Sequence, residues 1–172
     1  MRLPKDWREF VESLNSHGVE YVIVGAFALA FHGFPRYTGD IDILVRRSRV
    51  NAGRLEAALV AFGFASAGIP TADFLEADRV IQLGVAPNRI DLLTSITGVD
   101  FEEAWQTRVT SELDGLAVAF IDRASLILNK EQESNGAHTR PGRSRGSRGP
   151  VAFQSVTGGR WALDSPRRCT YP

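Results

Sequence analysis

The fold is decided by residues 21–45, which read YVIVGAFALAFHGFPRYTGDIDILV. The first four residues are β-branched or aromatic and predict a strand. Gly25 then opens an apolar helix that reaches about residue 32, and a loop follows. The segment ends in a second strand, residues 40–45, which carries Asp40 and Asp42 among apolar residues.

The two acids are informative because charge is normally excluded from an apolar strand. Side chains alternate between the faces of a strand, so Asp40 and Asp42 point to the same side. Two carboxylates on one face repel each other unless a cation lies between them. A hard divalent cation, Mg²⁺ or Mn²⁺, prefers oxygen ligands and is the cation that the pair suggests. Taken alone, the pair is equally compatible with a strand end that carries two solvated acids.

Features on both sides of this strand favour a phosphate site. A strand, a glycine and a helix N-terminus present free backbone N–H groups, so Gly25 and Ala26 are candidate nucleotide-binding residues. A third acid, Asp91, lies in the apolar segment RIDLL, which is predicted to form a hairpin with residues 80–85. Three carboxylates on neighbouring strands beside such a turn predict a two-metal site for phosphoryl transfer.

In this arrangement the chain resembles small bacterial nucleotidyltransferases of the DNA-polymerase-β-like superfamily. The resemblance rests on the glycine turn, the helix, the Asp-x-Asp strand and the later acid, and covers about residues 5–130. The segment HGFPRYTGDID, residues 32–42, is similar to a compact group that overlaps with toxin–antitoxin and abortive-infection proteins. The family's turn usually carries Gly-Gly or Gly-Ser. Gly25-Ala26 keeps the backbone N–H groups but removes a side-chain contact to a terminal phosphate.

The resemblance implies transfer of a nucleoside monophosphate from an NTP to a hydroxyl group on a protein, an RNA or a small molecule, with release of pyrophosphate. Asp40, Asp42 and Asp91 would be both the catalytic residues and the metal ligands. A cognate toxin or antitoxin protein is a possible partner. The alternative is a non-catalytic relative that binds nucleotide or a partner protein. The altered turn and C-terminus favour this alternative, and the three retained acids favour the enzyme.

Three further residues are candidates for binding the triphosphate. Arg36 and Thr38 lie in the loop before the acidic strand, where a guanidinium can reach phosphate. Lys130 is the third candidate. For Arg36 the competing interpretation is a solvated loop charge. His32 is interpreted as a residue that caps or packs the helix end rather than one that touches substrate.

The remaining patterns predict an α/β (α+β) fold in which helices flank a small mixed sheet, as the resemblance also implies. Helices are expected at residues 6–16, 51–62 and 101–107 and from residue 125, with a hairpin at residues 112–120. The charged N-terminus lacks the apolar core of a signal peptide, and no stretch is apolar enough to span a membrane. The single cysteine excludes an internal disulfide framework. We therefore expect a cytoplasmic protein.

The composition changes at residue 131, so the expected division is a nucleotidyltransferase-like domain at residues 1–130 and a tail at 131–172. Residues 1–130 hold 13 Lys and Arg against 17 Asp and Glu, whereas the tail holds 7 against 3 and is rich in Gly, Ser and Pro. A basic tail of this kind suggests nucleic-acid binding. Translation in a wrong reading frame explains it better.

Permissible codons for residues 128–134 contain GAACAAG twice in tandem. Removing one copy restores Leu-Asn-Lys-Arg-Ala, and residues 134–152 read one base later can encode a helical peptide that resembles the closing segment of the family. We therefore predict a seven-base duplication after Lys130, a disordered tail and a chain that is poorly stable or inactive. A gene without the repeat would refute the duplication.

Overall fold

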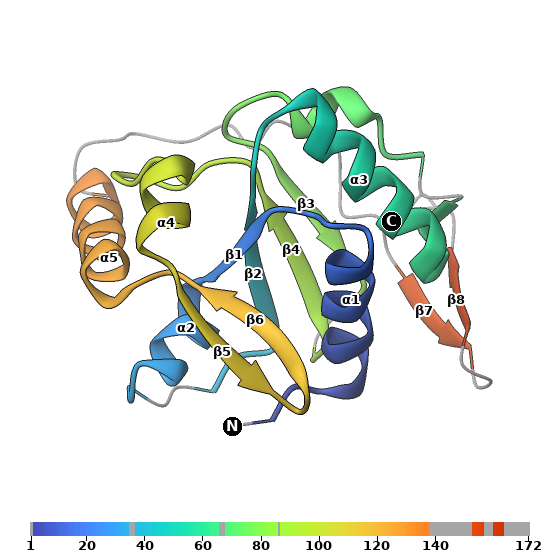
Figure 1. Cartoon of the computed structure of the whole chain (residues 1–172), viewed down its shortest axis with the longest axis horizontal. Helices are drawn as coiled ribbons and strands as arrows, with labels where there is room; N and C mark the ends of the chain where they lie inside the picture. The colour runs from blue at the N-terminus through green and yellow to red at the C-terminus, as the bar shows by residue number, and fades with distance from the viewer. Residues whose placement is uncertain are drawn as a thin grey trace, which may run out of the picture.

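A computed structural model describes residues 2–34, 37–65, 68–85, 87–137, 153–156 and 160–163 (Figure 1). Its centre is a six-stranded mixed sheet with the strand order β3-β4-β2-β1-β6-β5. The strands are β1 (Tyr21–Val24), β2 (Asp40–Val45), β3 (Val80–Leu83), β4 (Arg89–Leu93), β5 (Val109–Leu113) and β6 (Leu116–Phe120). The helices are α1 (Lys5–Ser16), α2 (Gly25–Phe31), α3 (Arg49–Leu59), α4 (Phe101–Thr107) and α5 (Arg123–Ala137), with short helical turns η1 (Val60–Phe64) and η3 (Thr71–Phe74).

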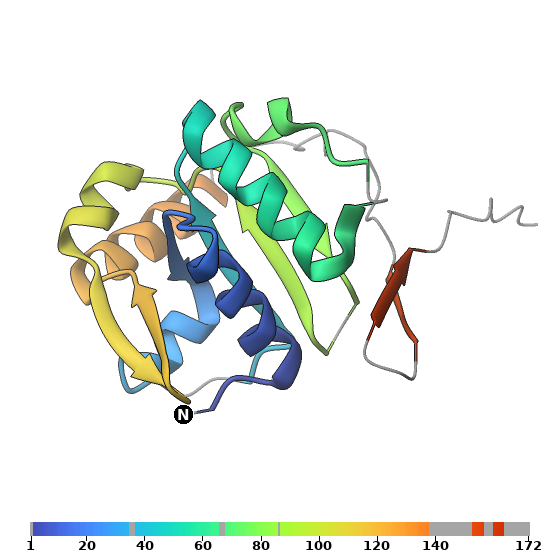
Figure 2. The ribbon, with the colours of Figure 1, turned by 45° about the vertical axis from the view of Figure 1, so that its right-hand side comes forward.

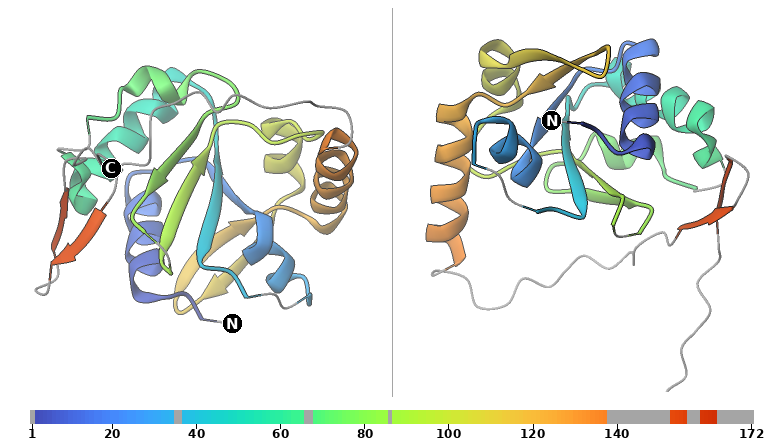
Figure 3. Two further views of the ribbon diagram at one scale, coloured as in Figure 1. Left: turned by 180° about the vertical axis from the view of Figure 1, so that it is seen from behind. Right: turned by 90° about the horizontal axis from the view of Figure 1, so that it is seen from below.

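Helices cover both faces of this sheet. Helices α1 and α3 lie side by side across one face (Figure 2), and α2 and α5 lie on the other (Figure 3). The expected α/β fold with a mixed sheet flanked by helices is therefore confirmed. Within the described part of the chain, no helix combines the length and the apolar character needed to cross a membrane.

The core forms where the amphipathic pattern of the sequence predicts it. Helix α1 buries one stripe at helical spacing, which comprises Trp7, Phe10, Val11 and Leu14. Strand β1 is buried along its whole length, because it lies inside the sheet between β2 and β6 and is covered on both faces. On β2, Ile41 and Ile43 are fully buried, and they alternate with the two acids, which therefore point toward the face that carries α2 and α5.

Two helices run differently from the sequence expectation. The helix expected at residues 51–62 ends as an α-helix at Leu59 and continues as the π-type turn η1, where Gly63 has a φ of 110°. The helix expected from residue 125 begins at Arg123, after Asp122 accepts hydrogen bonds from the backbone N–H groups of Ala124 and Ser125.

Helix α5 also passes the predicted domain boundary at residue 131 without interruption and continues to Ala137. Farther along, β7 (Phe153–Val156) and β8 (Arg160–Leu163) pair as an antiparallel hairpin. The predicted division into a domain at residues 1–130 and a disordered tail at 131–172 stays a prediction. Residues 138–152, 157–159 and 164–172 lie outside the described residues, and Cys169 is among them. The reading-frame hypothesis stays a prediction.

Candidate active site

The register of three strands brings the predicted acids to one place on the sheet. Strands β2 and β4 are parallel, with Asp40 opposite Arg89 and Asp42 opposite Asp91. Strand β1 is antiparallel to β2 and places Val24, the last residue before the glycine turn, opposite Asp42. Residues that are directly opposite on neighbouring strands share a face. The three carboxylates therefore lie on the α2/α5 face, beside the start of α2.

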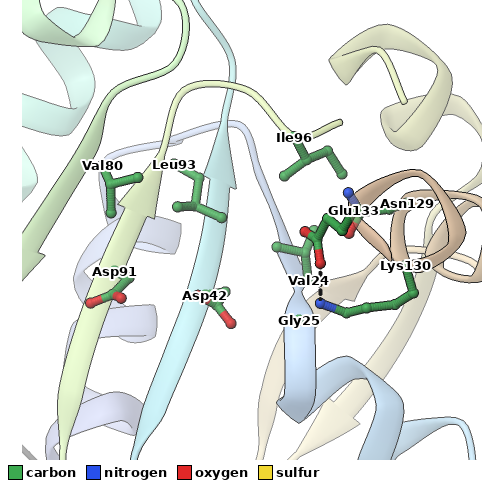
Figure 4. Close-up of a pocket in the computed structure, with 10 residues that line it drawn as sticks. All are labelled: Val24, Gly25, Asp42, Val80, Asp91, Leu93, Ile96, Asn129, Lys130 and Glu133. Carbon is green, nitrogen blue, oxygen red and sulfur yellow. Dashed lines mark hydrogen bonds and ion pairs between the residues drawn. The ribbon is translucent and has the colours of Figure 1, made fainter. Parts of the chain in front are cut away.

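A cavity of about 280 Å³ opens at this position (Figure 4). Its lining comes from strands β1, β2, β3 and β4, the turn into α2, the segment after β4, and helix α5. The lining residues are Val24, Gly25, Asp42, Val80, Asp91, Leu93, Ile96, Asn129, Lys130 and Glu133. Four residues that the sequence singled out, Gly25, Asp42, Asp91 and Lys130, thus meet in one cavity. Asp40, Ala26 and Thr38 are not part of its lining, and Arg36 lies outside the described residues.

Gly25 is packed directly against the Asp42 carboxylate. A Cβ atom built on Gly25 would lie 2.0 Å from Oδ2 of Asp42, far inside van der Waals contact. The φ of Gly25 is +67°, a left-handed backbone conformation that residues other than glycine rarely adopt. The sequence predicts Gly25 as part of a phosphate cradle. The structure adds a second reason for glycine, which is the room that Asp42 needs.

Asp42 makes no direct contact with a cation among the described residues. Among the described residues it makes no hydrogen bond and no ion pair. Burial, followed by the neighbouring charges of Asp40 and Asp91, raises the pKa of Asp42 from its ordinary value near 3.8 to about 6, while Lys130 and Arg89 act in the opposite direction. This half-buried carboxylate faces a cavity and is destabilised by its surroundings, so a bound cation would stabilise its charged form.

Asp40 and Asp91, by contrast, share an arginine. The Arg89 guanidinium donates to Asp91 through Nε at 2.8 Å from Oδ1 and through Nη2 at 3.1 Å from Oδ2, and Nη2 also pairs with Asp40. Gln82 donates a further hydrogen bond of 3.3 Å to Oδ2 of the buried Asp91. Sequence reasoning missed Arg89. The available signal was its position two residues before Asp91, which places both side chains on one face of the same strand.

Thr38 supports Asp40. Its hydroxyl lies 2.5 Å from Oδ1 of Asp40 and donates to it, which fixes this carboxylate at the start of β2. The predicted contact of Thr38 with phosphate stays a prediction. In the structure, its hydroxyl orients one of the acids.

The metal site predicted from all three carboxylates stays a prediction. Among the residues that the structure describes, no group of three or more His, Cys, Asp or Glu side chains is arranged to hold a metal ion. Arg89 lies between Asp40 and Asp91 instead. Asp42 and Asp91 nevertheless line the same cavity, and the unpartnered Asp42 is an oxygen donor of the kind that Mg²⁺ and Mn²⁺ prefer. These two residues fit one such cation.

Helix α5 brings Lys130 over the cavity, near the glycine turn (Figure 4). Its Nζ lies 2.9 Å from Oε2 of Glu133, one turn farther along the helix. Asn129 holds this part of α5 in place by donating a 2.9 Å hydrogen bond to the carbonyl of Thr97.

His32 lies elsewhere, with Nε2 2.7 Å from the carbonyl of Ile121, so this nitrogen donates its proton and ties the end of α2 to the residue that follows β6.

Comparison with known proteins supports the fold. No protein-family model matches the sequence, and no curated protein matches it. A crystal structure from Thermotoga maritima, described as a "putative nucleotidyltransferase", is similar to the chain with a TM-score of 0.51 and 15% identity. The match covers 77% of this chain and 88% of that one. The chain has a nucleotidyltransferase-like fold. At this identity the likeness concerns the fold alone, so the case for a site rests on the geometry described above.

Proposed function

We propose that this protein transfers a nucleoside monophosphate from an NTP to a hydroxyl group on a protein, an RNA or a small molecule. One observation carries the proposal. On a nucleotidyltransferase-like fold, the unpartnered Asp42 carboxylate lines a cavity together with Asp91, the Gly25 turn and Lys130. Asp42 and Asp91 would supply oxygen donors for a cation, and the Gly25 turn and Lys130 would supply backbone N–H groups and an ammonium group that suit phosphate.

The reaction would be an in-line displacement. The acceptor oxygen attacks the α-phosphorus, the bond from that phosphorus to the bridging oxygen of the β-phosphate breaks, and pyrophosphate leaves. The hydroxyl proton passes to one of the two cavity carboxylates, Asp42 or Asp91. Bound Mg²⁺ or Mn²⁺, held by the same two residues, would neutralise phosphate charge and lower the pKa of the attacking hydroxyl.

The other residues would position the nucleotide. The N–H groups at Gly25 and Ala26 would face phosphate oxygens, and Lys130 would reach them from α5 once it leaves Glu133. Asp40 is held by Thr38 and Arg89, so its part would be to keep β2 and β4 in register at the site. Catalysis would consist mainly of positioning and charge neutralisation.

Transfer of label from an NTP tests this proposal. The protein is incubated with NTPs labelled at the α-phosphate, with Mg²⁺ and with cell extract as the source of acceptor. We expect label on a macromolecule or small molecule with the wild type, and a loss of at least about 100-fold with Asp42→Asn. NTPs labelled at the γ-phosphate should leave no label on the acceptor, which excludes a kinase.

Asp73→Asn is the matched control for this change. Asp73 lies on η3, outside the cavity lining, and undergoes the same loss of charge. Its transfer activity should equal that of the wild type. Equal activity of Asp42→Asn and the wild type would contradict the proposal.

A second candidate function is nucleotide or partner binding without transfer, as in a component of a toxin–antitoxin pair. Two observations favour it. Ala26 in the turn has no hydroxyl to contact phosphate, and Lys130 is paired with Glu133. Retention of NTP on the protein without label transfer to any acceptor would support this function, and a neighbouring gene for a toxin or antitoxin would name the partner.

A further inference from the structure

Arg89 is the one cation that directly contacts the acids of the site among the described residues. It lies on β4 directly opposite Asp40 and two residues before Asp91, so strand pairing and strand alternation both direct it to the same face. Its guanidinium contacts both oxygens of Asp91 and pairs with Oδ2 of Asp40.

These contacts engage most of the carboxylate oxygens of the acidic cluster. Oδ1 of Asp40 already accepts from Thr38, so both oxygens of Asp40 are engaged. Both oxygens of Asp91 are engaged by Arg89, and Gln82 adds a third donor. Of the three acids, only Asp42 retains oxygens that no other described residue engages.

The charges show why a guanidinium belongs there. Three carboxylates on one face of neighbouring strands repel one another, and a cation between them removes part of that repulsion. A fork-shaped guanidinium bridges two carboxylates with several hydrogen bonds at once, which lysine cannot do. Arg89 therefore stabilises the acidic cluster when no metal ion is bound.

We infer that Arg89 is an internal counter-cation that bridges Asp40 and Asp91 and competes with a divalent cation for Asp91. This inference rests on the proposed function for its meaning, since it makes Arg89 a positioning residue of the same site. The competition keeps the affinity for free metal low. The cation then binds well only with a triphosphate, whose oxygens replace the ligands that Arg89 withholds.

Binding of Mn²⁺ alone to the full chain tests the inference. The affinity is measured by electron paramagnetic resonance for the wild type, Arg89→Gln and Arg89→Lys. We expect Arg89→Gln to bind Mn²⁺ more tightly, by about tenfold or more, because the acids are released. Arg89→Lys should lie between the two, since it keeps a charge but loses the fork.

Thermal unfolding supplies a second readout that does not depend on activity. In EDTA, Arg89→Gln should unfold several degrees below the wild type, because the acids are left without a counter-ion. Mn²⁺ should restore most of this difference in Arg89→Gln and raise the wild type less. A purely structural arginine would give a loss of stability that the metal does not repair.

Arg79→Gln is the matched control, since it breaks the ion pair with Glu76 outside the cavity. It should leave Mn²⁺ affinity unchanged.

Equal or weaker Mn²⁺ binding by Arg89→Gln would overturn the inference. If that variant does not fold, Arg89→Lys decides by the same comparison with the wild type. Label transfer by the wild type without tighter binding by the variant refutes only the role of Arg89. Tighter binding without any label transfer leaves that role standing and refutes the proposed function.

Discussion

Asp40 and Asp42 lie two residues apart on the same face of β2, yet their surroundings differ in almost every respect. Both oxygens of Asp40 are engaged, one by the Thr38 hydroxyl and one by Arg89. Asp42 has no hydrogen bond or ion pair among the described residues, and Gly25 is packed against it. A short motif thus contains one acid whose two oxygens are both engaged and one that makes no hydrogen bond or ion pair with the described residues.

The difference follows from where each residue meets its neighbours. Asp40 begins the strand, where the preceding loop supplies Thr38 and the parallel strand supplies Arg89 opposite. Asp42 lies farther into the sheet, opposite Val24 and Asp91, which offer no positive charge. Burial and the neighbouring carboxylates of Asp40 and Asp91 raise the pKa of Asp42 to about 6. Three changes would test the contrast between the two acids.

Gly25→Ala should have the largest effect on stability, because the new side chain would clash with the Asp42 carboxylate. The new methyl group would lie 2.0 Å from Oδ2 of Asp42, and the left-handed backbone at +67° disfavours alanine as well. We expect a loss of about 2–4 kcal/mol in the free energy of unfolding. Label transfer should also fail, since Asp42 must move. Urea denaturation measures the first effect.

Gly18→Ala separates sterics from backbone strain. Gly18 has nearly the same φ, +64°, but no described atom lies within 4 Å of the point where a Cβ atom would be added. It should lose only about 1 kcal/mol. Equal losses for the two variants would show that Asp42 yields easily and is not confined by the turn.

Asp42→Asn should stabilise the metal-free protein at neutral pH. A pKa raised from near 3.8 to about 6 means that ionised Asp42 costs the folded state free energy above pH 6, and that this cost disappears as the pH falls toward 3.8. The change corresponds to about 1–3 kcal/mol after allowance for solvent screening. Urea denaturation in EDTA between pH 4 and pH 8 measures it.

The comparison with the wild type isolates this one group. The stability advantage of Asp42→Asn should be greatest above pH 6 and vanish near pH 4. Asp40→Asn should show the opposite sign at neutral pH, because it weakens the contact with Arg89. An advantage that does not change with pH would mean that the environment of Asp42 is not the cause.

Much of the fold could be predicted because its strongest signals are local. The bounds predicted for β1, β2 and α4 agree with the structure, since a β-branched run, an acidic strand and the Asp100 cap each mark their own ends. Strand β5 begins at Val109, three residues before the predicted hairpin. It is an edge strand whose exposed Val109 and Thr110 show no apolar alternation.

The candidate site also has a part that the sequence predicts and a part that it does not. The Asp-x-Asp motif and the later acid indicate which residues meet, and the structure brings Asp42 and Asp91 into one cavity. The unequal surroundings of the two β2 acids depend on the register between β2 and β4, which pairs Arg89 with Asp40 across 49 residues of chain. The pairing of β2 with β4 cannot be read from a single sequence. The contact of Arg89 with the acids, and the difference between Asp40 and Asp42, were therefore not predicted.

Glu133→Gln should have the smallest effect on stability. It tests whether Asp42 can gain a cationic neighbour, as Asp40 has in Arg89. The ion pair between Lys130 and Glu133 is exposed, with side chains 41% and 46% accessible, so its loss should cost less than about 1 kcal/mol. The released ammonium group already lies close enough to lower the pKa of Asp42, and it should do so more strongly without Glu133.

Titration of the Asp42 carboxyl group by NMR would detect this change as a pKa below the value of about 6 in the wild type. Glu12→Gln, which breaks the exposed pair with Arg8 on α1, should leave Asp42 unaffected. An unchanged pKa in Glu133→Gln would mean that Lys130 does not turn toward the acid when it is freed. Because Glu133 lies beyond the predicted frameshift point after Lys130, a lowered pKa would also show that a residue beyond that point reduces the positive charge available to the site.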